Sequence, residues 1–224
     1  MKRVGHGGTL DPLASGLLPI LVGVATKFSA RLHEAMKVYD ARVRFGVETT
    51  TDDREGAVIR SSEVPALAPQ AIAPALDSLR GVIVQVPPAF AALKIGGRPA
   101  YSLARAGEKV TLAARQVQVH RLDVIGVEPP DLRLLVVCSS GTYVRAIARD
   151  LGRAMGSAAH LAALRRLAVG ALDVSSAIAA GEIRSRGADS LLRALRPVGN
   201  ELLALDPWYL ERPATIVVAG DAHA

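Results

Sequence analysis

The stretch ARQVQVHRLDVIGVEPPDLRLLVVCSSG (residues 114–141) contains two runs rich in valine, leucine and isoleucine that flank Pro129-Pro130. Such runs, separated by a proline break, predict two neighbouring β-strands. The next segment, TYVRAIARDLGRAMG (residues 142–156), carries apolar residues four positions apart and predicts an α-helix, with Thr142 as its N-cap. Two strands followed by a helix indicate a mixed architecture at the centre of the chain.

The segments on either side of this stretch also predict strands and helices. VYDARVRFGV (38–47) alternates apolar and polar residues and predicts a half-buried strand, and Gly96-Gly97 predicts a hairpin. Helices are expected over 69–80, starting at Pro69, and over GSAAHLAALRRLAVG (156–170). Hairpins with interspersed helices predict an α+β fold, in which helices flank a mixed, largely antiparallel sheet.

Composition limits the kind of protein. Of 224 residues 50% are hydrophobic, the net charge is +6, and residues 94–121 carry six basic side chains against one acid, which favours a polyanionic partner. Cys138 is the only cysteine, so the chain forms no intrachain disulfide and suits a reducing compartment. We expect a cytoplasmic protein without a membrane span or a secretory signal, and the five scattered histidines suggest no metal site.

GHGGTLDPLASGLLP (residues 5–19) contains a single carboxylate, Asp11, among glycines, small residues and leucines. Asp before Pro12 is typical of a helix start, with Asp11 as the N-cap and the proline in the first turn. Glycines instead allow the backbone to approach another group closely, so the loop is also a candidate site. The local sequence leaves both interpretations open.

Three arginines recur at four-residue spacing on the expected helix over 142–156, namely Arg145, Arg149 and Arg153. A stripe of this kind usually faces solvent. The Ser-Ser-Gly turn before the helix is also typical of an anion site, because the first backbone N–H groups of a helix have no partner within it.

Four motifs in order resemble the TruB family of tRNA pseudouridine synthases. They are GHGGTLDPLASGLLPILVGVATKFS (5–29), KVYDARVRFGVETTTDDREG (37–56), VPPAFAALKIGGRPAYSLARAGEKV (86–110) and CSSGTYVRAIARDLGRAMGSAAHLAALRRLAVG (138–170). The resemblance implies the pseudouridine synthase fold and isomerisation of a uridine in the tRNA T-loop, without cofactor or metal. It also implies the T-arm of tRNA as the partner, and we expect a monomer.

The resemblance assigns roles to individual residues. Asp11 corresponds to the catalytic aspartate, taken as the nucleophile, Tyr39 to a tyrosine that stacks on the uracil, and Arg145 to a cationic partner of the aspartate. A carboxylate that stays ionised in an apolar pocket needs such a partner, so Arg145 is expected to leave the solvent-facing stripe, whereas Arg149 and Arg153 are expected to stay in it.

Three further residues are expected to bind the substrate. His6 corresponds to a histidine that occupies the space left by the flipped uridine, Lys94 to a lysine beside the RNA-binding insertion, and Leu164 to an apolar wall of the base pocket. The basic run over 94–121 is expected to clamp the tRNA arm, mostly through phosphates.

We expect a catalytic domain over 1–183 and a C-terminal segment over 184–224 that corresponds to a shortened accessory region. Family members carry a strand ahead of the Gly-His motif, so we expect the sequence as given to lack a core strand and to leave an open sheet edge. A tRNA-binding or tRNA-folding protein without catalysis, or an inactive fragment, is the alternative.

Overall fold

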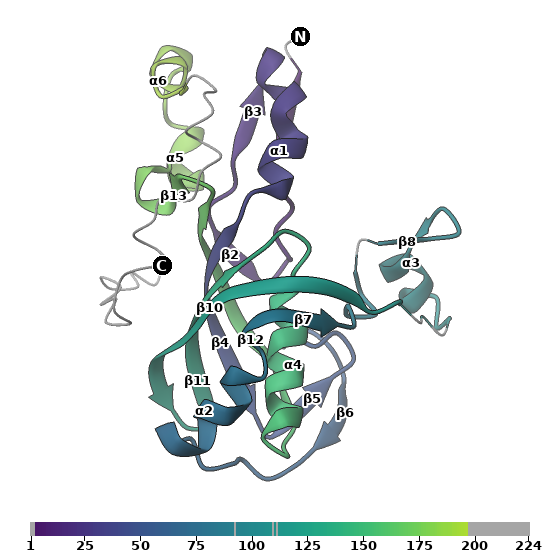
Figure 1. The fold of residues 1–224 in the computed structure, drawn as a ribbon. Coiled ribbons are helices and arrows are strands. Elements are labelled where there is room, and N and C mark those ends of the chain that lie inside the picture. The colour runs from purple at the N-terminus through teal and green to yellow at the C-terminus, as the bar shows by residue number, and fades with distance from the viewer. Residues whose placement is uncertain (1–2, 92, 109, 111, 197–224) are drawn as a thin grey trace.

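The computed structural model describes residues 3–91, 93–108, 110 and 112–196 (Figure 1). The main sheet contains the strands β2 (Ala14–Gly16), β4 (Lys37–Phe45), β7 (Gly81–Gln85), β10 (Arg115–Glu128), β11 (Asp131–Cys138), β12 (Ala159–Val169) and β13 (Leu172–Asp173). Three small sheets pair β1 (Val4–His6) with β3 (Ile20–Val22), β5 (Val47–Thr49) with β6 (Val58–Ser61), and β8 (Lys94–Ile95) with β9 (Arg98–Pro99). The helices are η1 (Gly23–Phe28), α1 (Ser29–Glu34), α2 (Pro69–Asp77), α3 (Ala100–Arg105), α4 (Val144–Ala154), η2 (Val174–Ser176), α5 (Ala180–Ile183) and α6 (Ala188–Arg193).

The main sheet runs in the order β13-β12-β4-β11-β10-β7, and its neighbours along this path are antiparallel. The short strand β2 lies off the path and pairs parallel to β12. The predicted fold class, α+β with a mixed and largely antiparallel sheet, is confirmed. The strands on either side of Pro129-Pro130, the hairpin at Gly96-Gly97 and the helix that begins at Pro69 were predicted correctly.

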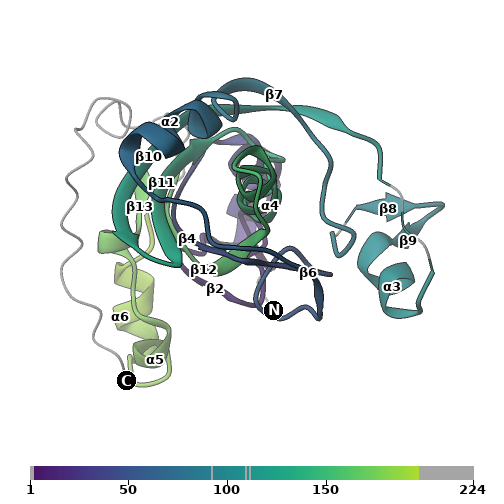
Figure 2. The same ribbon diagram turned by 90° about the horizontal axis from the view of Figure 1, so that it is seen from below.

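The core lies between the sheet and α4, around which the sheet curves (Figure 2). The alternation in β4 directs Ala41, Val43 and Phe45 into this core, where each is at most 2% exposed. From the opposite side α4 contributes Ile147 and Leu151, at most 1% exposed. Burial of a side chain of that size stabilises the fold by about 2 kcal/mol, so this contact fixes α4 against the sheet.

The helix predicted over 156–170 was wrong, because the segment forms β12, which pairs with β4. Leu161 and Leu164, three residues apart, pack in the same core because a register shift between Leu161 and Ala163 inserts an extra residue. Leu167, within a second shift between Arg166 and Ala168, packs in a separate cluster on the other side of the sheet. A bulged strand buried on both faces thus reproduces the leucine spacing of a helix.

The predicted N-cap of α4 was also wrong. The helix starts at Val144, the capping position is Tyr143, and its side chain makes no capping hydrogen bond. Gln85 of β7, which is fully buried, secures this end instead. Its side chain accepts from the Tyr143 N–H at 2.8 Å and donates to the Tyr143 carbonyl at 3.2 Å. The start of α4 is therefore fixed by the neighbouring strand rather than by a local cap.

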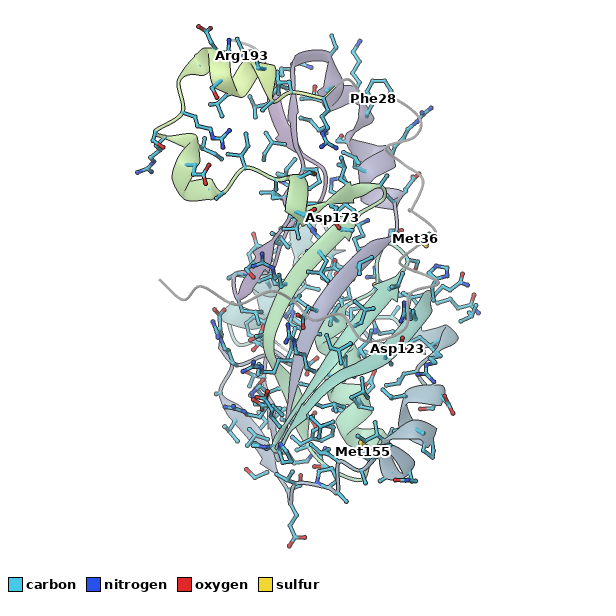
Figure 3. All side chains as sticks on the ribbon, turned by 90° about the vertical axis from the view of Figure 1, so that its left-hand side faces the viewer. Phe28, Met36, Asp123, Met155, Asp173 and Arg193 are labelled. Atoms are coloured by element: carbon cyan, nitrogen blue, oxygen red, sulfur yellow. The ribbon has the colours of Figure 1, made fainter. Side chains whose placement is uncertain are left out.

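Two groups of elements extend away from the sheet. The unit of β8, β9 and α3 projects to one side, and α1, β3, α5 and α6 lie at one end (Figure 1). Figure 3 shows Phe28 and Arg193 at that end, with Met155 at the opposite end. None of the described helices is long and apolar enough to cross a membrane. The expected boundary between 183 and 184 stays a prediction, and residues 197–224 lie outside the described residues.

Candidate active site

The loop over residues 5–19 does not begin a helix, so the interpretation of Asp11 as an N-cap was wrong. The backbone turns at Asp11, whose carbonyl accepts from Ala14 N–H at 2.9 Å, and then enters β2. At Gly16 (φ +96°) the loop approaches β12 so closely that a Cβ would lie 2.2 Å from the Arg166 carbonyl oxygen. The glycine-rich sequence thus permits close backbone contact, as the alternative interpretation required.

Arg166 of β12 anchors this loop, a role that no local pattern predicted. It is 1% exposed, and its guanidinium donates to the carbonyls of Leu17 (2.8 Å), Gly8 (3.0 Å) and Thr9 (3.2 Å). One side chain thus satisfies three backbone oxygens, of which those of Gly8 and Leu17 belong to buried residues. The position of Asp11 therefore depends on a residue far away in the sequence.

Asp11 receives a bidentate ion pair from Arg145 of α4. The distances are 2.9 Å from Nε to Oδ2 and 3.1 Å from Nη2 to Oδ1. The Arg145 side chain is 5% exposed, whereas that of Asp11 is 32% exposed. The arginine is thus a buried support, and the carboxylate stays open to one side. Fork-to-fork geometry fixes the direction of the carboxylate.

Two other segments of the chain form hydrogen bonds and a charge contact with the Arg145 guanidinium. Nη1 donates to the Thr51 carbonyl at 3.0 Å, and Nη2 donates to the Phe90 carbonyl at 3.2 Å. The buried carboxylate of Asp53 lies 3.7 Å from Nη1. Asp53 was not singled out from the sequence. Its burial has no local signal, because it arises from the bridge to Leu161 of β12.

A cavity of about 590 Å³ opens in front of Asp11. Its lining includes the aromatic rings of Tyr39, Phe90, Tyr101 and Tyr143 beside the Asp11–Arg145 pair. Burial raises the pKa of Tyr39 far above its usual range, so its phenol is neutral at physiological pH. A space of this size, with aromatic walls and one oriented carboxylate, suits a flat polar ring attached to a sugar.

Lys37 of β4 also lines this cavity and was not singled out from the sequence. It is 7% exposed, and its ammonium donates to the His33 carbonyl. Burial, supported by the positive charge of Arg166, lowers the pKa of Lys37 to about 8. Lys37 therefore carries a positive charge at neutral pH and loses it above about pH 8.

The three expected substrate-binding residues lie apart. His6, on β1, is exposed and lines a neighbouring hollow with Arg3 and His33, its ring centroid 6.3 Å from that of His33. Leu164, on β12, is 7% exposed and packs in the main core. Lys94 lies in β8, on the projecting unit. Their roles stay predictions.

The stripe of arginines on α4 does not face solvent as a whole. Arg149 is 7% exposed and makes ion pairs with Asp52 at 2.7 Å and Asp150 at 2.8 Å, so its expected exposure was wrong. The Arg153 side chain is 54% exposed and pairs with Glu48. Helical spacing correctly predicted a shared face, but two of the acids that pair with it, Glu48 and Asp52, come from another part of the chain.

The basic run over 94–121 is not a uniformly exposed patch. Arg121 is 9% exposed and pairs with Asp123. Arg115 stacks over the Tyr143 ring at 4.8 Å, at the edge of the cavity. Within the described parts of the chain, no three His, Cys, Asp or Glu side chains are grouped so as to hold a metal ion.

Residues 1–144 match the family described as TruB family pseudouridylate synthase (N terminal domain). The chain belongs to the TruB family. The match contains Asp11 and Tyr39 and ends one residue before Arg145. The glycine-rich loop that carries Asp11 therefore lies within the matched region.

Curated TruB-family relatives include tRNA pseudouridine synthase B of Aromatoleum aromaticum, 48% identical over 196 residues that cover 88% of this chain and 63% of the relative. The protein of the same name from Ralstonia nicotianae is 45% identical over 201 residues, covering 88% and 64%. The chain thus spans less than two thirds of the length of these relatives.

The fold agrees with solved structures. A chain in the crystal structure of a Cbf5-Nop10-Gar1 complex superposes with a TM-score of 0.62 and 27% identity, covering 82% of this chain and 45% of that one. A chain in an H/ACA RNP bound to a substrate RNA containing 2'-deoxyuridine gives a TM-score of 0.58 at 23% identity, with 82% and 44% covered, and supports the fold alone.

Proposed function

We propose that this TruB-family chain converts a uridine in the T-loop of tRNA to pseudouridine, with Asp11 as the catalytic carboxylate. The observation that carries the proposal is the bidentate Asp11–Arg145 pair facing an aromatic cavity of about 590 Å³. The names of the curated relatives supply the reaction and the class of RNA.

The chemistry needs one carboxylate and no cofactor. When the glycosidic C1′–N1 bond breaks, positive charge develops on the sugar, and the ionised Asp11 attacks or stabilises it as the nucleophile. The uracil turns, and C5 forms the new bond to C1′. C5 loses one proton and N1 gains one, so atoms and electrons balance without an external reactant. The neutral phenol of Tyr39 supports its assignment to stacking on the base during this rotation.

The target uridine must leave the stacked T-loop before it reaches Asp11. We assign His6 to the space that the uridine vacates, and Lys94 to contact with the T-arm. Leu164 supports the apolar side of the site from the core. We further propose that 1–183 form the catalytic domain, that 184–224 form an accessory segment, and that the chain acts as a monomer in the cytoplasm.

The test uses an unmodified tRNA transcript and the purified chain, with pseudouridine mapped chemically along the RNA. We expect one modified position in the T-loop, and no product from a transcript in which that uridine is replaced by cytidine. Salt-sensitive binding of tRNA without any pseudouridine would overturn the proposal and favour a tRNA-binding or tRNA-folding role. The absence of both binding and product would favour an inactive fragment.

The lowered pKa of Lys37 leads us to expect that tRNA binding depends on pH. The positive charge of Lys37 in the cavity attracts RNA phosphate, and it is lost as the pH rises through about 8. We expect tRNA binding to weaken about threefold more between pH 7 and pH 9 in the wild type than in Lys37→Met. Filter binding at constant ionic strength measures this difference. Equal pH slopes in the two proteins would show that Lys37 does not contact the RNA.

A further inference from the structure

Two arginines one helical turn apart on α4 form hydrogen bonds with the same two segments of the chain, the 51–53 turn and residues 86–90. Arg145 reaches the Thr51 carbonyl on one side and the Phe90 carbonyl on the other. Arg149 reaches the next residue of the first segment, Asp52, and the backbone of the second segment at Val86. The helix thus holds the 51–53 turn and the 86–90 segment at two successive levels.

The contacts of Arg149 are short and enclosed. Its Nη1 lies 2.7 Å from Asp52 Oδ2, and its Nη2 donates to the Val86 carbonyl at 2.8 Å. Its Nε donates to Asp150 Oδ1 at 2.8 Å. Both Arg149 and Asp52 are 7% exposed. A charged pair this deeply buried contributes little net stability, because desolvation offsets the attraction between the charges. Its geometric precision suggests a positioning role instead.

The backbone at Asp52 transmits this contact to the catalytic pair. Asp52 has φ +60°, the one positive φ among the described non-glycine residues. Its carbonyl accepts from Leu161 N–H at 3.0 Å, which ties the turn to β12. The groups on either side of it, the Thr51 carbonyl and the Asp53 carboxylate, are those that face Arg145. A shift of Asp52 therefore moves both of these partners of Arg145.

We propose that the Asp52–Arg149 pair positions the 51–53 turn against Arg145 and thereby sets the orientation in which Arg145 presents Asp11 to the substrate. Asp52 and Arg149 are positioning residues, since neither touches the reacting atoms. This inference rests on the proposed function, and its test includes one readout that does not depend on catalysis.

Because Asp52 is ionisable, the proposed positioning role predicts a pH dependence of the reaction rate. The charged groups that face it are Arg149 and Arg145 from α4 and Glu48 from β5, and Glu48 is itself paired with Arg153 and Arg60. Burial outweighs the pull of Arg149 and raises the pKa of Asp52 from 3.8 to about 6. Because this pKa is higher than in the unfolded chain, the contribution of Asp52 to folding stability decreases as the pH rises from about 4 to 6. Lowering the pH therefore weakens the Asp52–Arg149 ion pair, although protonation of Asp52 itself favours the folded state.

The kinetic test compares Asp52→Asn and Arg149→Met with the control Arg165→Met, which removes an exposed arginine of β12. Asparagine tolerates a positive φ, so Asp52→Asn removes the charge with little backbone strain. We expect kcat on unmodified tRNA to fall about tenfold in both variants, with KM changed less than about twofold, and Arg165→Met to keep the wild-type kcat. A fall of less than about twofold in Asp52→Asn would overturn the proposal.

The pH profile separates positioning from general destabilisation. The kcat of the wild type is expected to fall below about pH 6, as Asp52 becomes protonated. In Asp52→Asn the rate is expected to stay at the lower level between about pH 5 and 7. An acid limb that persists unchanged in this variant would contradict the inference.

Hydrogen exchange supplies the readout that is independent of activity. In Arg149→Met we expect faster amide exchange in residues 49–56 and 86–90 than in the wild type, whereas Arg165→Met should leave these peptides unchanged. If the wild type makes no pseudouridine, the proposed function fails, and the exchange result alone decides the inference. Unchanged exchange in Arg149→Met would overturn it in either case.

Discussion

Replacing Asp11 with asparagine is expected to abolish pseudouridine formation while the chain still folds and binds tRNA. Asparagine has nearly the same shape, but it carries no negative charge and cannot act as the nucleophile. Arg145 keeps its hydrogen bonds to the Thr51 and Phe90 carbonyls and the nearby Asp53, so the pocket does not collapse. We expect the rate to fall by at least about 1,000-fold, measured by single-turnover conversion of a tRNA transcript.

The matched control for this variant is Asp77→Asn. Asp77 ends α2, its side chain is 66% exposed, and it pairs with Arg80 on the surface. This change should leave both the conversion rate and tRNA affinity at wild-type values. Appreciable conversion by Asp11→Asn, or equal losses in both variants, would show that the reaction does not depend on the Asp11 carboxylate.

Replacing Arg166 with methionine is expected to give the largest loss of stability among single changes near the site. Methionine fills part of the same volume but removes the donors to the Gly8, Thr9 and Leu17 carbonyls. We expect the free energy of unfolding to fall by about 3 kcal/mol, because the carbonyls of the buried residues Gly8 and Leu17 lose their donor. Urea unfolding measures this, and the conversion rate should fall as well, since the loop carries Asp11.

Arg165 offers a control at the neighbouring position. It lies on the same strand but its side chain is exposed, since successive residues of β12 point to opposite faces at this point. Arg165→Met should change the free energy of unfolding by no more than about 0.5 kcal/mol. Similar losses in the two variants would mean that the burial of Arg166, and its contacts with the loop, do not stabilise the fold.

Local patterns predicted three strands at the centre of the main sheet but not β12, which pairs with one of them. The alternation over 38–47 identified β4, because one polar and one apolar face leave a clear period of two. The two apolar runs on either side of Pro129-Pro130 identified β10 and β11. β12 combines two register shifts with residues of high helix propensity, so both local signals favoured a helix. Only pairing with β4, contributed by a distant segment, makes it a strand.

The residues of the candidate site were likewise predicted only in part. The motifs identified Asp11, Tyr39 and Arg145 as candidates, and the structure brings these three to one cavity; their catalytic roles stay predictions. Asp53, Arg149 and Arg166 were missed or misplaced, because each is a charged residue whose burial depends on a partner from another part of the chain. A single sequence predicts such residues as solvent-facing, since charge is normally excluded from the interior unless it is paired.

The contacts that hold the Asp11 loop also constrain when the site can form during synthesis. Asp11 meets Arg145 across 134 positions of the chain, and Gly8 meets Arg166 across 158. A ribosome working from the N-terminus releases the loop first and its anchors much later, so the loop waits without its partners while most of the sheet is made. Contacts between residues so distant in sequence are among the slowest to form. The Asp11 carboxylate therefore gains its place only when β12 joins the sheet, which makes completion of this strand the step that creates the site.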